Sequence, residues 1–187
     1  MANPLRVTEK TDVIAGPKKA FPDAIVLDDI LSIQQLLPEA SAQSKSLFQQ
    51  GLMLMDIGDY PGARGAFCDV IRGHGGDTLK APAYFAWGVA FYREGDLEAA
   101  ADHFMNYQIF FGDEVKMQNF ALAAGFDLGL TEMQLMWAAT NDAARLAAAQ
   151  AAARAWNSFL TRWPNSPQAP TARLSLREVQ YFLSLHN

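Results

Sequence analysis

The sequence lacks the features that define several common classes of protein. No uninterrupted apolar run approaches the roughly 20 residues that a membrane-spanning helix requires, so we expect no membrane span. There is no excess of positive charge, since 15 Lys and Arg stand against 20 Asp and Glu and the net charge is −5. An acidic chain is a poor match for nucleic acid, and we expect no nucleic-acid partner. Residues 1–16 also lack the basic-then-apolar pattern of a secretory signal.

Cysteine is almost absent. Cys68 is the single cysteine, so an internal disulfide is impossible and no redox compartment can be inferred from it. It follows Phe67 on an apolar helical stripe, and we expect it to be a small buried hydrophobe. A lipid-anchored bacterial protein carries its cysteine at the mature N-terminus, and this chain has none there.

Residue types for catalysis and metal binding are equally sparse. His74, His103 and His186 lie far apart, and none has a second ligand at the spacing of metal sites. The glycine-rich segment His74–Asp77 is not followed by Gly-Lys-Ser or Gly-Lys-Thr, which argues against a phosphate-binding loop. We predict no metal site, no cofactor and no catalytic residues. An enzyme is the minor alternative, because residues distant in sequence can converge in a folded chain.

What the chain does contain is an internal repeat with an interval of 37 residues (88 − 51 = 37). The repeated residues are Gly51, Gly58, Asp59, Ala63 and Phe67, which recur as Gly88, Gly95, Asp96, Ala100 and Phe104. One more shift leads from Gly88 to Gly125. Small residues and an aromatic at fixed phase predict helix–turn–helix units of the tetratricopeptide type. We therefore predict an all-α, right-handed solenoid, in which the glycines let paired helices approach and the two phenylalanines fill the space between units.

The same pattern predicts the order of the elements. Residues 1–22 are expected to form an extended arm, and residues 23–187 a single helical-repeat domain. Helix Asp23–Leu37 has Asp23 as its N-cap and Pro38 as its end. Three repeats follow at about 42–77, 79–113 and 114–163, and a closing helix at about 169–185.

Turns and aromatic residues refine this plan. The first helix of the first two units is expected to end at Gly58 and Gly95 in the left-handed conformation. The third unit lacks this turn, and its first helix is expected to run from about Glu114 to Ala139. Four tryptophans are expected in the core, namely Trp87, Trp137, Trp156 and Trp163.

Fixed positions of the first helix of each unit line the concave face of a tetratricopeptide solenoid. Counted from the repeated glycines, this partner-binding groove is mainly apolar and consists of Lys45, Phe48, Leu52, Met55, Phe85, Val89, Tyr92, Arg93, Leu122 and Phe126. An exposed apolar patch of this size marks a binding surface, usually for a helix or an extended peptide. Tyr92 and Arg93 are the expected anchors for polar groups of the partner. In the alternative, helix Asp23–Leu37 fills the groove in cis.

Charge is unevenly distributed along the chain. Residues 94–142 contain nine Asp and Glu with Lys116 as the single base, whereas residues 143–177 contain five Arg and no acid. This asymmetry predicts charge-complementary docking, within the chain or with a partner. Two independently solvated faces are the alternative.

The segment Ala155–Arg173 carries a narrower signal. An aromatic residue and a Leu before a Trp-Pro-Asn-Ser-Pro turn, followed by Ala-Pro and a further helix, resemble the repeats of two bacterial envelope families. These are BamD, the outer-membrane β-barrel assembly lipoprotein, and YbgF (CpoB), a periplasmic coordinator. Gly76–Ala83 stands where those families place a Pro-Asp-Ser-Pro-Tyr-Ala segment. The resemblance spans about residues 41–185 and implies a non-catalytic scaffold of the bacterial envelope, in the periplasm. The chain shows neither the signal peptide nor the lipidation cysteine, and residues 1–38 have no counterpart.

Together these patterns predict a protein–protein interaction scaffold that serves as an accessory subunit of a multi-subunit assembly. Protein partners are expected to bind the groove and the N-terminal arm. The alternative is a chaperone that holds a peptide or helix of a secreted substrate in the groove. The oligomeric state is not predicted.

Overall fold

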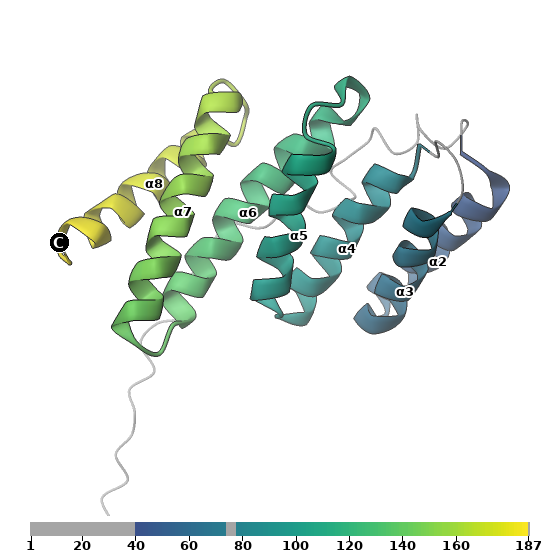
Figure 1. Ribbon diagram of the computed structural model, residues 1–187, viewed down its shortest axis with the longest axis horizontal. Helices are drawn as coiled ribbons and strands as arrows, with labels where there is room; N and C mark the ends of the chain where they lie inside the picture. The colour runs from purple at the N-terminus through teal and green to yellow at the C-terminus, as the bar shows by residue number, and fades with distance from the viewer. Residues whose placement is uncertain (1–39, 74–77, 187) are drawn as a thin grey trace, which may run out of the picture.

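The computed structural model describes residues 40–73 and 78–186, and all regular structure in these ranges is helical. The helices follow one another across the molecule in chain order, each packed against the one before it (Figure 1). They are α2 (Ala42–Asp56), α3 (Tyr60–Arg72), α4 (Lys80–Glu94), α5 (Leu97–Phe110), a 3-10 turn η3 (Val115–Met117), α6 (Gln118–Ala138), α7 (Asp142–Arg162) and α8 (Ala169–Ser184). The expected all-α, solenoid-like arrangement is confirmed. The predicted arm 1–22 and the predicted helix Asp23–Leu37 lie outside the described residues.

The turn between the two helices of each early unit is built by a Gly-Asp pair. Gly58 and Gly95 have φ of 79° and 91°, a left-handed conformation that glycine adopts without steric cost. The next amide then bonds back into the helix, with Asp96 N donating to Phe91 O at 3.0 Å. The aspartates cap the following helix, since Asp59 Oδ1 accepts from Gly62 N at 3.0 Å and Asp96 Oδ1 from Ala99 N at 3.2 Å. The left-handed glycines were predicted, whereas the capping role of the aspartates was not.

The third unit departs from this plan at both ends of its first helix. The chain forms the 3-10 turn before α6, so the helix begins at Gln118 rather than at Glu114. Gln118 Nε2 holds this connection by donating to Gly112 O at 3.0 Å and to Glu114 O at 3.1 Å. At the other end α6 continues to Ala138, and Asn141 replaces the Gly-Asp pair by accepting from Ala144 N at 2.8 Å.

The repeated glycines lie where paired helices cross. A Cβ atom built on Gly51 would collide with the Phe67 ring, and one on Gly88 would come within 2.9 Å of Phe104. The repeat predicted crossings at Gly51, Gly88 and Gly125, whereas it assigned Phe67 and Phe104 to the space between units. At Gly125 the same space is taken by Trp163, which a Cβ atom would approach to 2.8 Å. In all three cases close packing requires the absence of a side chain.

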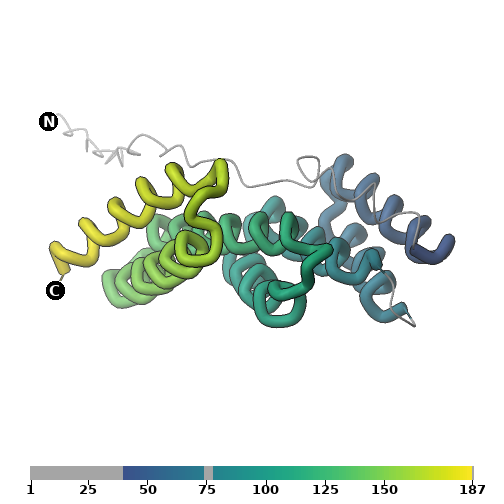
Figure 2. Tube along the Cα trace, turned by 90° about the horizontal axis from the view of Figure 1, so that it is seen from above, coloured from purple at the N-terminus to yellow at the C-terminus, as the bar shows by residue number. Residues whose placement is uncertain are grey.

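The array has two rows of helices. In Figure 2, α2 and α8 lie on the upper side of the array, and α5 and α7 on the lower side. One row consists of α2, α4, α6 and α8, and the other of α3, α5 and α7. We call them the first row and the second row. Within the first row α4 contacts α6 and α6 contacts α8, and these contacts are more extensive than any between helices of the second row. Closer spacing within one row means that the array curves toward that row. The row of α2, α4, α6 and α8 is therefore the inner one.

Two clusters of buried side chains form the core. The first extends from Phe48 on α2 to Ala124 on α6, and the second joins α6, α7 and α8 around Trp156. Trp87 and Trp163 pack at the edges of these clusters, and Trp156 is fully buried. The prediction was wrong for Trp137, which is 43% exposed in the last turn of α6. Cys68 is half-buried rather than part of the core.

Candidate protein-binding face

The ten residues predicted to line a groove all lie on inner-row helices. Lys45, Phe48, Leu52 and Met55 are on α2, Phe85, Val89, Tyr92 and Arg93 on α4, and Leu122 and Phe126 on α6. The repeat therefore places them on equivalent elements, as the shared interval of 37 residues requires. Whether each side chain can meet a partner depends on its burial.

Five of the ten are core residues, which corrects the expectation that they form an accessible lining. They are Phe48, Met55, Phe85, Val89 and Phe126, and all are buried. Phe85 shows the reason, because its ring lies 5.8 Å from Phe104, 6.1 Å from Tyr107 and 6.0 Å from Phe120, measured between centroids. Phe126 is held in the same way by Trp156 at 5.3 Å. These side chains join helices to one another and offer no surface to a partner.

The other five keep accessible surface on the inner row. Lys45, Leu52, Tyr92 and Leu122 are half-buried, and Arg93 is exposed. Tyr92 also ties α4 to α6, because the Gln134 side-chain amide donates to its hydroxyl. The accessible part of the predicted groove is thus a set of apolar and aromatic edges with two cationic side chains.

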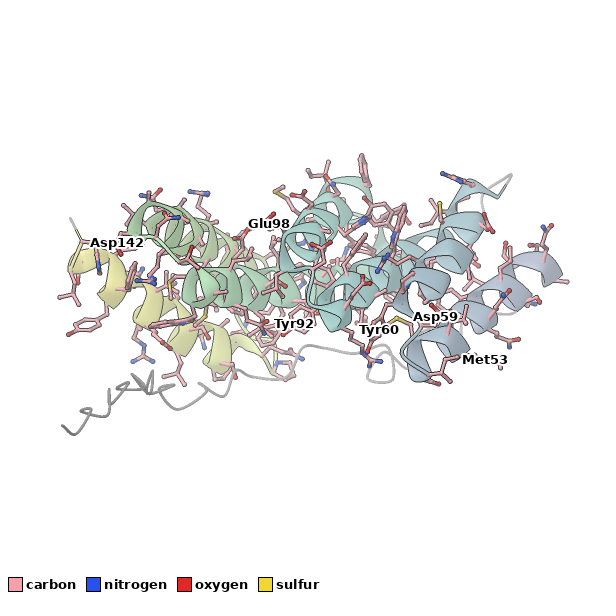
Figure 3. All side chains as sticks on the ribbon, turned by 90° about the horizontal axis from the view of Figure 1, so that it is seen from below. Met53, Asp59, Tyr60, Tyr92, Glu98 and Asp142 are labelled. Atoms are coloured by element: carbon pink, nitrogen blue, oxygen red, sulfur yellow. The ribbon has the colours of Figure 1, made fainter. Side chains whose placement is uncertain are left out.

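The edge at which first-row helices turn into second-row helices is a further accessible surface. Figure 3 looks onto it, with Met53 and Tyr92 in the last turns of α2 and α4, and with Asp59, Glu98 and Asp142 at the starts of α3, α5 and α7. Exposed apolar side chains stand among these acids, notably Met53 at 69% and Ile57 at 77% exposure. The groove prediction missed them because they lie off the helical face that the repeated glycines define.

Two shallow hollows interrupt the surface. One, of about 450 Å³, lies between the start of α4 and η3 and is lined by Lys80, Lys116 and Glu114 beside apolar Phe111, Val115 and Met117. The other, of about 380 Å³, lies between the start of α5 and the α6–α7 turn, where Glu98 stands over alanines and Leu135. Neither hollow is lined by His or Cys. Within the described residues no group of three His, Cys, Asp or Glu side chains could hold a metal ion.

His103 is an ionisable group enclosed by aromatic side chains. Its ring is packed among aromatic rings, 4.6 Å from Trp87, 5.1 Å from Phe91 and 5.2 Å from Tyr84 between centroids. Burial lowers its pKa from the ordinary 6.5, because the charged imidazolium is poorly solvated there. Asp102 opposes this shift and Arg64 adds to it. Such packing holds α4 against α5 and leaves the imidazole neutral near pH 7.

A second half-buried group is Glu132 on α6. Burial raises the pKa of its carboxyl, while Arg154 on α7 lowers it. His103 lies on α5 and Glu132 on α6, and neither residue lines either hollow. The geometry therefore supplies no acid–base pair at these hollows.

Part of the uneven charge is paired within the chain. Arg162, at the end of α7, lies 3.1 Å from Asp113 in the connection before α6 and also donates to Gly112 O. Its guanidinium stacks 4.9 Å from the Trp163 ring centroid. This is one contact between the acidic middle and the arginine-rich end, as the within-chain alternative predicted. Arg145 pairs locally with Asp142 at 3.5 Å.

No helix in the described residues is long and apolar enough to cross a membrane. No protein-family model matches this chain, and neither does any curated protein sequence. The class of the protein is therefore defined by its fold, a repeat-like, all-α array in which consecutive helices pack against each other.

Proposed function

We propose that this protein is a non-catalytic scaffold for protein–protein interaction and acts as an accessory subunit of a larger assembly. The observation that carries the proposal is the inner row itself. Equivalent helices repeat along the array, and on them Leu52, Tyr92 and Leu122 keep apolar or aromatic surface beside the cations Lys45 and Arg93. Repeat arrays use such extended inner surfaces to hold other polypeptides.

The chemistry of this face indicates the partner. Apolar edges favour a helix or an extended segment that inserts apolar side chains along the row. Lys45 and Arg93 favour carboxylates on the partner, and Arg and Tyr are frequent anchors at interfaces. We therefore propose a protein segment that combines apolar residues with Asp or Glu. The resemblance of the Ala155–Arg173 turn to BamD and YbgF (CpoB) repeats makes the bacterial envelope the proposed setting.

Charge reversal tests this proposal without disturbing the core. Lys45→Glu with Arg93→Glu is expected to abolish capture of partners from the native cell, as measured by affinity purification and mass spectrometry, while the helical circular dichroism is unchanged. Arg72→Glu with Arg154→Glu is the matched control, because both arginines are exposed on second-row helices, α3 and α7. Loss of the same partners from both double variants, or from neither, would contradict a role for the inner row.

A further inference from the structure

The second-row helices recur at the repeat interval, and the same interval predicts one more such helix upstream of the described residues. Shifting α3 (Tyr60–Arg72) back by the repeat interval of 37 gives residues 23–35. Shifting α5 (Leu97–Phe110) back by two intervals gives 23–36. Both shifts place a second-row helix on the amphipathic segment Asp23–Leu37.

The positions that are buried in second-row helices are also apolar in the upstream segment. Three pairs of equivalent residues are buried in both α3 and α5, namely Ala63 and Ala100, Phe67 and Phe104, and Val70 and Tyr107. In the upstream segment the same three positions are Val26, Ile30 and Ile33. A polar residue at any of them would contradict the phase, and all three are apolar.

The face of α2 that such a helix would meet is uncovered. Ile57 and Met53 are exposed, and Leu54 is half-buried at the edge of the first core cluster. On α4, the residues equivalent to Leu54 and Ile57 are Phe91 and Glu94, and both are contacted by Arg64 of the preceding helix α3. Arg64 of α3 stacks 4.4 Å from the Phe91 ring centroid and pairs with Glu94.

The residues equivalent to Arg64 and Glu94 can be compared at each boundary between a second-row helix and the first-row helix that follows it. At every such boundary the two residues are chemically compatible. Between α3 and α4 they form the ion pair of Arg64 with Glu94. Between α5 and α6 the equivalent residues are Ala101 and Thr131, which are small and both buried. Upstream of α2 the equivalent residues are Leu27 and Ile57, and both are apolar. A charged residue at one of the two positions and an apolar residue at the other would be a mismatch, and none of the three boundaries has one.

We propose that Asp23–Leu37 forms a second-row helix that packs in cis against the outer face of α2, with Leu27 over Leu54 and Ile57. It is the second half of a partial repeat and seals the first end of the array. The connection Pro38–Ser41 is short, and short connections place consecutive helices side by side and antiparallel. Terminal elements of solenoids cover the apolar face at the end of the stack. The exposed Ile57 is part of such a face.

A charge-exchange cycle in the full chain tests the pairing. Leu27→Arg and Ile57→Glu are each expected to lower the midpoint of thermal unfolding by about 2–4 °C or more, because each places a charge against an apolar residue. The double variant recreates the Arg64–Glu94 pair and is expected to recover most of the loss. Ile109→Glu is the control partner for Leu27→Arg, since Ile109 is a similarly exposed isoleucine on α5. Purely additive losses, or no loss in either single variant, would overturn the proposal.

Cross-linking distinguishes the possible occupants of this face. In a Cys68→Ser background, Leu27→Cys with Ile57→Cys is expected to give an intramolecular link within the monomer when treated with a short bismaleimide. Leu27→Cys with Ile109→Cys is expected to give none. An efficient link from Leu27→Cys to Leu52→Cys would place the segment in the inner-row groove and refute packing on the outer face. Links formed only between two chains would assign the face to a second copy, which also refutes the proposal.

Discussion

At the scale of single residues, the array depends on positions where a side chain is absent. Gly51 and Gly88 lie within helices, where glycine is otherwise unfavourable, and each faces a phenylalanine of the next helix. The benefit is close approach rather than unusual backbone geometry, because the positive φ values in the described residues belong to Gly58 and Gly95 in the turns. Glycine therefore has two separate uses in this repeat.

Gly51→Ala is expected to destabilise the protein by about 1–3 kcal/mol, because its methyl group overlaps the Phe67 ring and the core must shift. Gly65→Ala is the matched control, since nothing lies within 4 Å of a Cβ atom there and Gly65 is exposed within α3. The control is expected to stabilise by about 0.5–1 kcal/mol through helix propensity. Chemical denaturation measures both, and equal effects would refute the crossing argument.

His103 makes stability depend on pH in a defined direction. Its pKa in the folded protein is below the ordinary 6.5, so the unfolded state binds more protons between that folded value and about pH 6.5. The free energy of unfolding is therefore expected to fall as pH decreases below about 6.5 and to be unaffected by this group at higher pH. Replacing the imidazole by Phe should remove this contribution, because the surrounding rings already form an aromatic site.

The measurement is the free energy of unfolding at pH 7.5 and pH 5.5 for the wild type and His103→Phe. The difference between the two proteins isolates His103 from Glu132, whose raised pKa acts in the opposite direction. A wild-type loss that persists unchanged in His103→Phe would assign the pH dependence to another group.

At the scale of elements, the Gly-Asp pair forms the whole connection between α4 and α5, and with Ile57 it forms the connection between α2 and α3. The glycine ends one helix and the aspartate begins the next, so α2–α3 and α4–α5 are joined by the same hydrogen bonds. Each pair therefore determines both a helix end and a helix start. The third unit obtains its helix start from Asn141, which is an equally good cap.

Asp59→Ala and Asp96→Ala are each expected to cost about 1 kcal/mol of stability, because the first turn of α3 or α5 loses the acceptor for an unpaired amide. Asp59→Asn and Asp96→Asn are the controls, since an Asn side-chain oxygen can accept the same bond. Denaturant unfolding measures the four variants. If Asn costs as much as Ala, the aspartates act through charge rather than through capping.

At the scale of the whole molecule, the two core clusters divide the array into connected halves. The first cluster unites α2 to α5 with the start of α6, and the second unites α6, α7 and α8. Helix α6 belongs to both. Because contacts are mainly between neighbours, stability in such arrays is close to a sum of local contributions.

Phe85→Ala, which removes a fully buried ring of the first cluster, is expected to cost about 3–5 kcal/mol. Its effect on amide hydrogen exchange should be largest in α2–α5 and small in α8. Trp156→Ala is the reciprocal variant and should mainly expose α7 and α8, because Trp156 belongs to the second cluster. Uniform loss of protection across all helices in both variants would show a single cooperative unit instead.

Much of the fold was predictable, and particular residues show why. The turns after α2 and α4 were predicted from Gly58 and Gly95, whose left-handed conformation ends a helix locally. The caps that Asp59 and Asp96 supply to α3 and α5 were not predicted, although each acts on an amide only three residues away. The candidate site was less predictable. Phe85 stands at a groove position by count, yet Phe104, Tyr107 and Phe120 enclose it. Its burial depends on residues that the count from Gly88 does not consider.

The sequence alone determined the helices, the turns, the crossing glycines and the interval between units. These features depend on local hydrogen bonds, on backbone conformation and on a periodic pattern, all of which neighbouring residues encode. The tertiary structure decided which side chains of the inner row remain open, so that Leu52 and Arg93 keep accessible surface while Val89 and Phe126 do not. That outcome depends on which side chains the neighbouring helices bring against each position, as Trp156 of α7 does against Phe126, and not on any one helix by itself.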